Sequence, residues 1–378
     1  MREVAIFRHN LFKISEPFIT QQAQQLERFK PFYLGRLRYG DPPNGAEAMA
    51  LQDRPGRSTL PGIGWQMLTR DPQPYQRLMG NHRPALIHAH FGIDGVYALP
   101  LAKQLRVPLV TTFHGFDATL ANGYFLCSPA WANYPLFRRQ LARQGAVFLC
   151  VSSFIRDRVL AMGFPEERTH VHYIGIDLES TGVRAPDQET PMILHVGRQV
   201  AMKGTVYVIR AFARLAQQIP GVELVIIGDG PLRKRMQSLA QSLGLTERIR
   251  FLGALPHQQV MTWMRKAAML VLPSVRTRTG RNEGLGMVLL EAAATGVPMI
   301  GSRQGGIPEA ISDGETGLLV SERNDEELAA AMNTLLNDPA MRLHMGQQAR
   351  TLVERRFDIR RQTAKLERHY ENTLSSKT

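Results

Sequence analysis

Two carboxylates stand eight residues apart in the stretch EGLGMVLLE, which begins at Glu283 and ends at Glu291. Gly284 and Gly286 oppose helix formation, whereas the residues from Met287 onward favour it. We therefore expect Glu283 to lie just ahead of a helix N-terminus. Free backbone N–H groups and the positive end of the helix dipole favour an anion, such as a phosphate, at that point.

The distance between the two carboxylates limits what they can do together. A wholly helical segment would separate them by roughly 12 Å at about 1.5 Å per residue. A glycosidase pair needs a separation of roughly 5 to 9.5 Å, so hydrolysis by this pair is disfavoured. Two contacts to different parts of one long ligand suit the spacing better. The alternative is one Glu at a helix start and another on a helix face, with no ligand, and spacing alone does not decide between the two.

Two cations follow a predicted strand in HVGRQVAMKG, residues 195–204. Gly197 allows a tight exit at the carboxyl end of that strand, the edge at which open α/β sheets bind ligands. The guanidinium of Arg198 and the ammonium of Lys203 would neutralise a diphosphate there, together with the charge that develops as it leaves. Two solvated cations on a loop are the alternative.

The stretch from Glu283 to Glu291 resembles the Glu-x7-Glu motif of the retaining glycosyltransferases of family 4. Residues 195–204 resemble the strand, loop and helix start whose Arg and Lys hold the donor diphosphate in that family. GSRQGGIPEAISDGETGLLV, residues 301–320, is similar to the family's Gly-Gly-x-x-Glu loop and the stretch that follows it. Three motifs in the family's order are much more specific than any one of them.

This resemblance implies an α/β protein of the GT-B architecture, in which two Rossmann-like, doubly wound domains face each other across a cleft. It also implies a retaining, metal-independent glycosyltransferase without a cofactor, which moves a hexosyl unit from a UDP- or GDP-sugar to a saccharide acceptor. The donor is expected mainly on the second domain and the acceptor on the first. The resemblance also implies that the acceptor hydroxyl attacks from the side of the departing diphosphate, and no residue stands out as a covalent nucleophile.

The resemblance further implies roles for the residues of the donor site. Arg198 and Lys203 hold the diphosphate, Glu283 contacts the sugar hydroxyls, and Glu291 contacts the ribose. Glycines in the loop near residue 305 let the backbone approach the ligand, although an ordinary connecting loop is the alternative. The remaining donor contacts are expected at Gly197, Gly284, Leu285, Gly286, Met287, Gly305 and Gly306.

His114 lies in TTFHGFD, directly after a predicted strand of the first half. Resemblance to the family's His-Gly motif implies that it contacts the donor sugar or its phosphate, which would make it catalytic together with Arg198, Lys203 and Glu283. A satisfied loop histidine is the alternative. Asp117 is a candidate on the acceptor side, but an Asp in such a loop is often a turn residue or a helix cap.

The N-terminus departs from the family. Many members carry a glycine-rich loop after the first strand, whereas RHNLFKISEPFIT here contains no glycine. Its Ser-Glu-Pro-Phe run resembles a Ser-Glu-x-Phe variant of exopolysaccharide-type members, which places Ser15 and Glu16 on the acceptor side. The structural alternative is a helix that starts at Pro17 and is capped by Ser15 or Glu16.

His88 and His90 alternate on a predicted strand and therefore share a face. Together with Asp94 they would give a set of only three metal ligands, so we expect no metal there. His90 is instead expected to line the acceptor side. The absence of an Asp-x-Asp triplet and of a P-loop also argues against a metal-anchored diphosphate.

Composition indicates two globular domains, since the chain has 378 residues, 44% of them hydrophobic. No run of 18 apolar residues occurs and the N-terminal apolar run is short, so we expect neither a membrane span nor a signal peptide. We therefore expect a cytoplasmic location. Cys127 and Cys150 lack metal-type spacing and are expected to be core thiols.

The net charge of +13 is spread over both halves of the chain. No basic patch is interleaved with aromatic residues, which argues against nucleic acid as a partner. An anionic membrane surface is the favoured partner and solvated charged faces are the alternative. Together with the Ser-Glu-x-Phe variant, this charge suggests a polyprenyl-diphosphate-linked acceptor of exopolysaccharide or lipopolysaccharide synthesis, and a peripheral position on the inner face of the membrane.

Strand-like and helical runs alternate along the chain, as in parallel sheets covered by helices. A polar stretch at 177–191 is the expected linker between domains at 1–180 and 181–356, and by resemblance the last helix, about 357–374, packs back on the first domain. Residues 40–60 are expected to form a loop. The expected strands are 4–7, 85–90, 109–113, 147–151, 192–196, 223–227, 249–252, 269–272 and 299–301. The expected helices are 18–29, 95–105, 154–162, 203–218, 230–243, 258–267 and 284–295.

Two other functions remain open at this point. A sugar phosphorylase would use similar halves and similar basic residues, and a non-catalytic protein would bind a sugar nucleotide without transferring the sugar. An NAD-linked enzyme is disfavoured because GDGP, residues 228–231, lacks the third glycine of a dinucleotide fingerprint.

Overall fold

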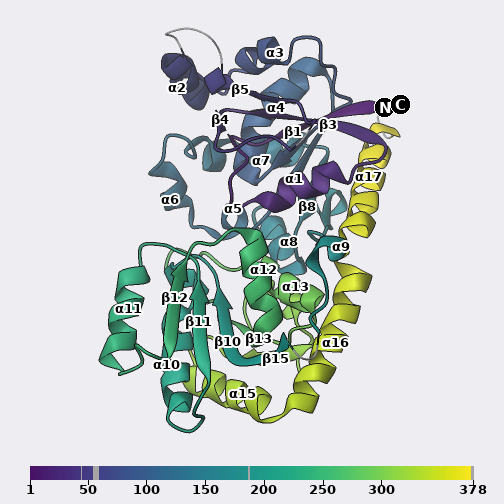
Figure 1. Cartoon of the computed structure of the whole chain (residues 1–378). Coiled ribbons are helices and arrows are strands. Elements are labelled where there is room, and N and C mark those ends of the chain that lie inside the picture. Colours follow the sequence, from purple (N-terminus) through teal and green to yellow (C-terminus); the bar gives the residue numbers. More distant parts are fainter. Residues whose placement is uncertain (44, 54–58, 186–187, 376–378) are drawn as a thin grey trace. The chain divides into compact units, whose positions relative to one another are not determined.

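The computed structural model describes residues 1–43, 45–53, 59–185 and 188–375. It divides into two compact units, Met1–Gly175 with Ile359–Thr378 (unit 1) and Ile176–Asp358 (unit 2). The sequence predicted a division between residues 180 and 181, five positions later. Both units are α/β (Figure 1).

Unit 1 is built on a seven-stranded sheet in which all neighbouring strands are parallel. Its strand order is β5-β3-β1-β6-β7-β8-β9, so the chain starts near the middle of the sheet and extends it first to one side and then to the other. The inner strands β6 and β7 are buried along their whole length, because helices cover both faces of a parallel sheet. The strands are β1 Arg2–Phe7, β3 Phe29–Gly35, β5 Ala48–Ala50, β6 Leu86–His90, β7 Leu109–Phe113, β8 Val147–Cys150 and β9 Thr169–Val171, with a separate pair, β2 Asn10–Leu11 and β4 Leu37–Arg38.

Helices follow most strands of unit 1. Gly92 and Gly95 let α4 (Gly92–Leu105) lie close to its neighbours, since a Cβ at Gly92 would come within 2.5 Å of the Phe113 ring and one at Gly95 within 2.8 Å of Thr111. The others are α1 Pro17–Gln24, α2 Thr59–Thr69, α3 Gln73–Met79, α5 Phe116–Thr119, α6 Asn122–Leu126, α7 Asn133–Gln144 and α8 Ser153–Ala161.

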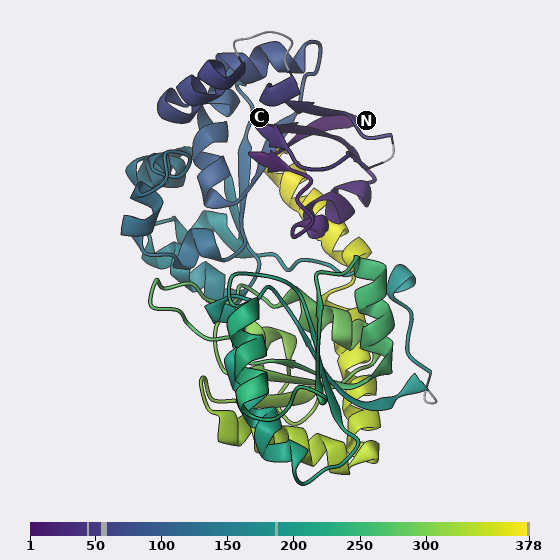
Figure 2. The same cartoon turned by 60° about the vertical axis from the view of Figure 1, so that its left-hand side comes forward.

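The last helix, α17 (Ile359–Ser375), belongs to unit 1 by its contacts. The buried Glu367 carboxylate accepts hydrogen bonds from the backbone N–H groups of Glu27 at 2.9 Å and Arg28 at 2.6 Å. The Tyr370 hydroxyl lies 2.6 Å from Nδ1 of His88. Figure 2 shows this helix, in yellow, running past the N-terminal elements.

Unit 2 contains a six-stranded parallel sheet in the order β12-β11-β10-β13-β14-β15. The order reverses between β10 and β13, which are neighbours although two strands separate them in sequence. Ligands bind at such a reversal, beyond the carboxyl ends of the strands. The strands are β10 Thr190–Val196, β11 Glu223–Ile227, β12 Ile249–Gly253, β13 Ala267–Leu272, β14 Met299–Ser302 and β15 Gly317–Val320.

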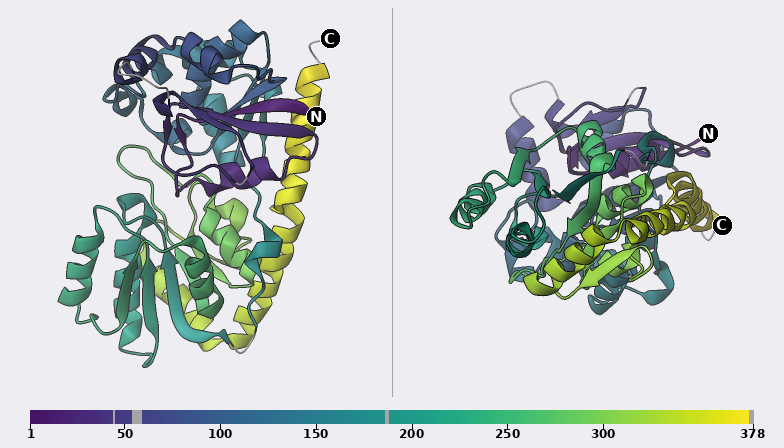
Figure 3. Two further views of the ribbon diagram at one scale, coloured as in Figure 1. Left: turned by 45° about the horizontal axis from the view of Figure 1, so that its top comes forward. Right: turned by 60° about the horizontal axis from the view of Figure 1, so that its bottom comes forward.

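Helices cover both faces of the unit 2 sheet (Figures 1 and 3). The core on one face joins α10, α11 and α15 to strand residues, with Phe212 and Leu328 fully buried. Helix α10 shows the apolar periodicity of a helix that buries one face. They are α9 Leu178–Thr181, α10 Thr205–Ala216, α11 Arg233–Ser242, α12 His257–Lys266, α13 Met287–Thr295, α14 Ile307–Ala310, α15 Asp325–Asn337 and α16 Pro339–Arg356.

Three expectations need correction. The helix expected at 18–29 ends at Gln24, and Phe29 begins β3, because Pro31 cannot continue a helix and the apolar run 32–34 is buried in the sheet. Cys127 is exposed rather than in the core, unlike Cys150. The linker expected at 177–191 contains α9 and the start of β10, and residues 186–187 lie outside the described part, as do parts of the loop expected at 40–60.

Within the described residues, no helix has both the length and the hydropathy that a bilayer crossing requires.

Candidate functional site

The candidate site in unit 2 lies at the carboxyl ends of β10 and β13, where Lys203 and Glu283 meet. Nζ of Lys203, in the short 3-10 turn after β10, lies 2.7 Å from Oε2 of Glu283. Ser274 Oγ, just after β13, donates to the same carboxylate oxygen at 2.9 Å. The Lys203 and Glu283 side chains are only 17% and 11% exposed, so the pair is held in one position and partly shielded from water.

Two glycines allow the backbone turns around this pair. Gly204 has φ +70°, and a Cβ there would lie 2.0 Å from the Pro273 carbonyl oxygen. Gly305 has φ +58°, and a Cβ there would lie 2.3 Å from the Glu283 carbonyl oxygen. Gly306 N–H donates to that same carbonyl at 3.1 Å. The predicted Gly305–Gly306 loop therefore packs directly on the backbone of Glu283.

Helix α13 begins at Met287, as the helix preferences of the residues indicated, three positions after the start of the expected range 284–295. Gly286 precedes it with φ +85°, a backbone conformation that favours glycine. Leu285 is buried, as are the glycines on either side of it. Gly284 and Leu285 thus form the approach to a helix N-terminus, which attracts an anion.

Glu291 lies on α13 opposite the first residue of α12. Its Oε1 is 3.2 Å from Nε2 of His257. The hydrogen bond with Glu291 raises the pKa of His257 above its ordinary value, against a smaller opposing effect of burial. The Glu291 side chain is 20% exposed and is therefore accessible to a ligand hydroxyl.

Arg198 is exposed, and its side chain makes no hydrogen bond or ion pair with other described residues. Gly197, by contrast, donates to Ile227 at 2.9 Å and accepts from the Gln199 amide at 3.1 Å. Both polar groups of Gly197 are therefore engaged within unit 2. Arg198 keeps a cation available at the end of β10.

In unit 1, His114 follows β7 and completes a stack of three imidazoles with His88 and His90. The ring centroids of His88 and His90 are 4.3 Å apart, and those of His90 and His114 are 5.3 Å apart. His90 Nδ1 lies 3.0 Å from His114 Nε2. Burial, followed by neighbouring charges, holds the pKa of each ring well below its ordinary value, so all three are neutral near pH 7. His114 Nδ1 is buried and without a partner among the described residues.

Asp117 supports this histidine rather than facing outward. Its Oδ1 accepts from the backbone N–H groups of His114 at 3.2 Å and Gly115 at 2.9 Å, and its Oδ2 accepts from Gly92 at 2.8 Å. Burial raises the pKa of Asp117 to about 6, and these hydrogen bonds oppose that rise. The structure thus agrees with the turn-residue alternative for Asp117.

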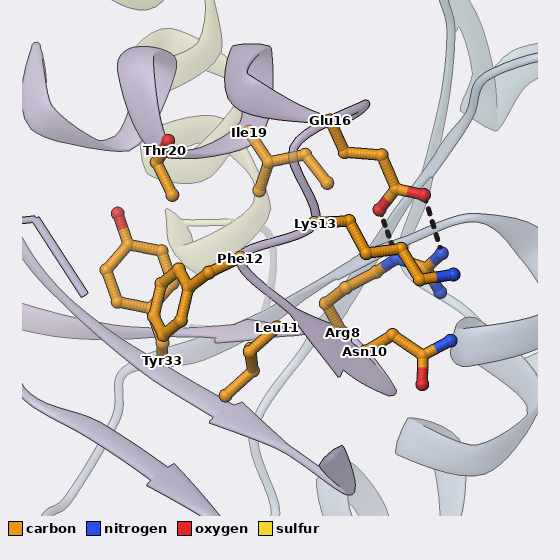
Figure 4. A pocket seen from close by; sticks show the side chains of 9 residues that line it. All are labelled: Arg8, Asn10, Leu11, Phe12, Lys13, Glu16, Ile19, Thr20 and Tyr33. Atoms are coloured by element: carbon orange, nitrogen blue, oxygen red, sulfur yellow. Dashed lines mark hydrogen bonds and ion pairs between the residues drawn. The ribbon is translucent and has the colours of Figure 1, made fainter. Parts of the chain in front are cut away.

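The glycine-free loop after β1 is held by buried charges. Arg8 pairs with Glu16 at 2.9 Å and with Asp94 at 2.6 Å, and His9 also pairs with Asp94. Figure 4 shows the Glu16 carboxylate turned onto the Arg8 guanidinium. Although burial raises it, the charges of Arg8 and His9 lower the pKa of Asp94 to about 2. The loop is thus held by one local ion pair, Arg8 with Glu16, and one long-range ion pair, Arg8 with Asp94.

Pro17 begins helix α1 and Glu16 occupies its N-cap position, as the structural alternative expected, but no side-chain hydrogen bond caps the helix. Ser15 is exposed, whereas His90 is buried within the stack. Asp94 contacts Arg8 and His9, not the face shared by His88 and His90. The sequence reasoning missed Arg8, His9 and Ser274. Only the position of Arg8 and His9 directly after a strand could have pointed to them.

Two family models match consecutive parts of the chain. The model described as Glycosyltransferase Family 4 matches residues 35–180, and the model described as Glycosyl transferases group 1 matches residues 179–352.

Curated relatives point the same way. The colanic acid biosynthesis glycosyltransferase WcaL of Salmonella typhimurium is 32% identical over 65% of this chain and 59% of its own length. WcaL of Escherichia coli is 31% identical over 74% of this chain and 69% of its own length. The chain thus matches about three fifths to two thirds of the length of the relatives that it resembles.

Solved structures share the fold over nearly the whole chain. Sucrose-phosphate synthase from Thermosynechococcus elongatus superposes with a TM-score of 0.80 at 21% identity, covering 100% of both chains. HepE of Anabaena, solved in complex with UDP and glucose, superposes with a TM-score of 0.77 at 18% identity, covering 98% of this chain and 100% of HepE. These likenesses confirm the predicted α/β fold of GT-B proteins.

Proposed function

The chain belongs to the glycosyltransferases with group 1 and family 4 domains, and from this membership we propose that it transfers a hexosyl unit from a UDP- or GDP-sugar to a saccharide acceptor. The transfer retains the anomeric configuration and needs no metal ion or cofactor. The complex of HepE with UDP and glucose supports a nucleotide sugar as the donor, since HepE has the same fold.

The observation that carries this proposal is the contact between Lys203 and Glu283 at the reversal of strand order in unit 2. Lys203 and Arg198 stabilise the charge on the departing diphosphate. Glu283, held by Lys203 and Ser274, accepts hydrogen bonds from sugar hydroxyls. Glu291 accepts a hydrogen bond from the ribose. With these roles, one extended donor contacts residues that lie in separate parts of the sequence.

In the transfer step, the bond from the sugar anomeric carbon to the diphosphate oxygen breaks as the bond to the acceptor oxygen forms on the same face. The proton of the acceptor hydroxyl passes to the departing diphosphate oxygen. The basic residues after β10 lower the energy of the step because they stabilise the charge that develops on the diphosphate. His114 of unit 1 remains a predicted contact to the donor sugar.

We propose a polyprenyl-diphosphate-linked saccharide of exopolysaccharide or lipopolysaccharide synthesis as the acceptor. Relatives named for colanic acid biosynthesis support it. Unit 1 also exposes aromatic and aliphatic side chains on and next to α6 and α7, close to basic residues, and such surfaces suit an anionic membrane. These side chains are Tyr124, Leu126, Trp131, Leu136, Arg138, Arg139 and Arg143.

A donor screen tests the proposed function. Purified protein is melted with UDP-, GDP- and ADP-sugars, because a ligand that binds the folded state raises its stability. The sugar that gives the largest shift is then incubated with a saccharide acceptor, and the anomeric proton coupling of the product is read by NMR. Transfer with retention supports the proposal. Phosphate-dependent breakdown of a disaccharide would instead identify a phosphorylase.

Flotation with liposomes tests the membrane part separately. We expect the protein to rise with vesicles that contain anionic lipid at low salt and to remain below at high salt. Equal recovery with neutral and anionic vesicles would contradict the proposed electrostatic contact.

A further inference from the structure

A cavity of about 720 Å³ lies in unit 2, and the loop that carries Lys203 forms part of its lining. It is bordered by the loop after β10, the first turns of α10 and α11, the segment after β13, and Arg323. None of residues 283–291 lines it, so it excludes the contacts assigned to the donor sugar and ribose, but it shares Arg198 and Lys203 with the predicted donor diphosphate contact.

Basic residues dominate the polar lining of this cavity. No aspartate or glutamate is among the described residues that line it. Its seven cations are Arg198, Lys203, Arg235, Arg276, Arg278, Arg281 and Arg323.

Most of this charge is not neutralised within the protein. Lys203 is paired with Glu283, but the side chains of Arg198, Arg235, Arg276 and Arg278 make no hydrogen bond or ion pair with other described residues. Burial and the nearby charge of Arg198 lower the pKa of Arg281, which shows that like charges lie close together here. Such an arrangement is unfavourable without an anion and favourable with one.

The loop that carries three of the arginines has a defined shape. The Thr277 N–H donates to the Arg281 carbonyl at 3.0 Å, and the Arg281 N–H donates to Thr277 Oγ1 at 3.0 Å. Arg323 donates to the Arg276 carbonyl, and Val275 N–H donates to Met202 at 2.7 Å. The guanidinium groups therefore project from a turn that is closed before any ligand arrives, which reduces the entropy lost on binding.

The floor of the cavity is apolar. Val206, Tyr207 and Leu232 lie on the surface of the unit 2 core, and Met236 and Val275 are buried beneath. The volume falls within the range of roughly 300–1,000 Å³ that small-molecule sites occupy.

We propose that this cavity binds a diphosphate group in addition to the donor diphosphate, with the arginines on the phosphates and any apolar substituent on the floor. Five cations of the lining remain once Arg198 and Lys203 are assigned to the donor diphosphate. Two sources supply this chemistry, the head group of a lipid-linked diphosphate and a free phosphate compound. The proposal goes beyond the transfer reaction and does not depend on it.

The test measures binding by calorimetry with UDP present at saturation, so that the residues assigned to the donor are already occupied. The probes are inorganic pyrophosphate and farnesyl diphosphate. We expect saturable binding of pyrophosphate that weakens with salt. Tighter binding of farnesyl diphosphate assigns the site to a lipid-linked head group, and equal binding assigns it to a free phosphate compound.

Matched variants locate the binding. Arg235→Gln with Arg278→Gln removes one charge from each side of the cavity, and we expect affinity for pyrophosphate to fall about tenfold or more. Arg210→Gln with Lys234→Gln removes the same charge from exposed positions of α10 and α11 outside the cavity lining and should change affinity much less. An equal loss in both double variants, or no pyrophosphate binding by the wild type, would overturn the proposal. Failure of sugar transfer would leave this result unaffected, because no turnover is measured.

Discussion

Lys203 and Glu283 are 80 positions apart in sequence, yet the ammonium of one lies 2.7 Å from a carboxylate oxygen of the other. The contact exists because β10 and β13 are neighbours in the sheet and each leads into a loop that ends at this point. Lys203, which is predicted to contact the diphosphate, thus holds Glu283, which is predicted to contact the sugar, in position.

Replacement of either partner should reduce transfer strongly. For Lys203→Met and for Glu283→Gln we expect kcat/KM to fall by about 10²- to 10³-fold, because each removes a preorganised group that stabilises the transition state. Circular dichroism should show that both variants remain folded. Lys266→Met, at the exposed end of α12, is the control and should retain activity. Near-normal turnover of the Lys203 or Glu283 variant would contradict the assigned site.

Gly305 should be less replaceable than Gly221, although both have a positive φ. In Gly221→Ala the new Cβ meets nothing within 4 Å, and we expect a cost of about 1–2 kcal/mol from the backbone conformation alone. In Gly305→Ala the Cβ would lie 2.3 Å from the Glu283 carbonyl oxygen, so the loop must move. We expect a larger loss of stability in urea and weaker binding of the donor. Equal effects of the two substitutions would show that the close packing of Gly305 on Glu283 is unimportant.

Two glutamates of α17 offer a matched comparison, because both bind Arg28. Glu367 is 3% exposed and also accepts two backbone N–H groups, whereas Glu371 is 38% exposed. We expect Glu367→Gln to cost unit 1 about 1–3 kcal/mol and Glu371→Gln less than about 1 kcal/mol. Unfolding is followed by fluorescence in a Trp263→Phe background, so that only tryptophans of unit 1 report. A larger effect at Glu371 would contradict the bonding described here.

The His257–Glu291 pair should report donor binding by NMR. The raised pKa of His257 means that the folded protein holds this proton more tightly than the unfolded chain does, so the pair stabilises below pH 6.5 and loses its effect as pH rises through the folded pKa. Glu291→Gln should bring the His257 titration back toward 6.5. A nucleotide whose ribose engages Glu291 should lower the pKa of His257 as well. A titration unchanged by the nucleotide would argue against the ribose contact.

The histidine stack of unit 1 should make the protein sensitive to acid. His88, His90 and His114 have depressed pKa values, so the unfolded chain binds more protons than the folded one once pH falls below 6.5. Each such proton changes the free energy of unfolding by about 1.4 kcal/mol per pH unit, up to about 4 kcal/mol for three. Urea unfolding in the Trp263→Phe background should show stability falling from pH 6.5 toward pH 5. A flat profile would contradict burial of three neutral rings.

Much of the secondary structure follows from local patterns, and the exceptions are instructive. The strand at 109–113 is where the sequence placed it, and the helix expected at 284–295 begins at Met287 and ends at Thr295. The helix expected at 18–29 was too long, because the apolar run that follows Pro31 is buried as a strand in the sheet, which local periodicity cannot distinguish from a helix. Cys127 was misplaced for a related reason, since residue type states a tendency to be buried but not the position of the side chain in the fold.

By itself, the sequence determined the alternation of strands and helices, the glycines that end them and the residue types available to hold a donor. These depend on neighbours within a turn or two of the chain. The tertiary structure alone decided that Lys203 meets Glu283, that Arg8 is shared by Glu16 and Asp94, and that arginines from four separate segments border one cavity. Except for Arg8 with Glu16, these contacts join residues tens of positions apart. They are set by the order of strands in each sheet and by the packing of side chains between elements, which no local pattern records.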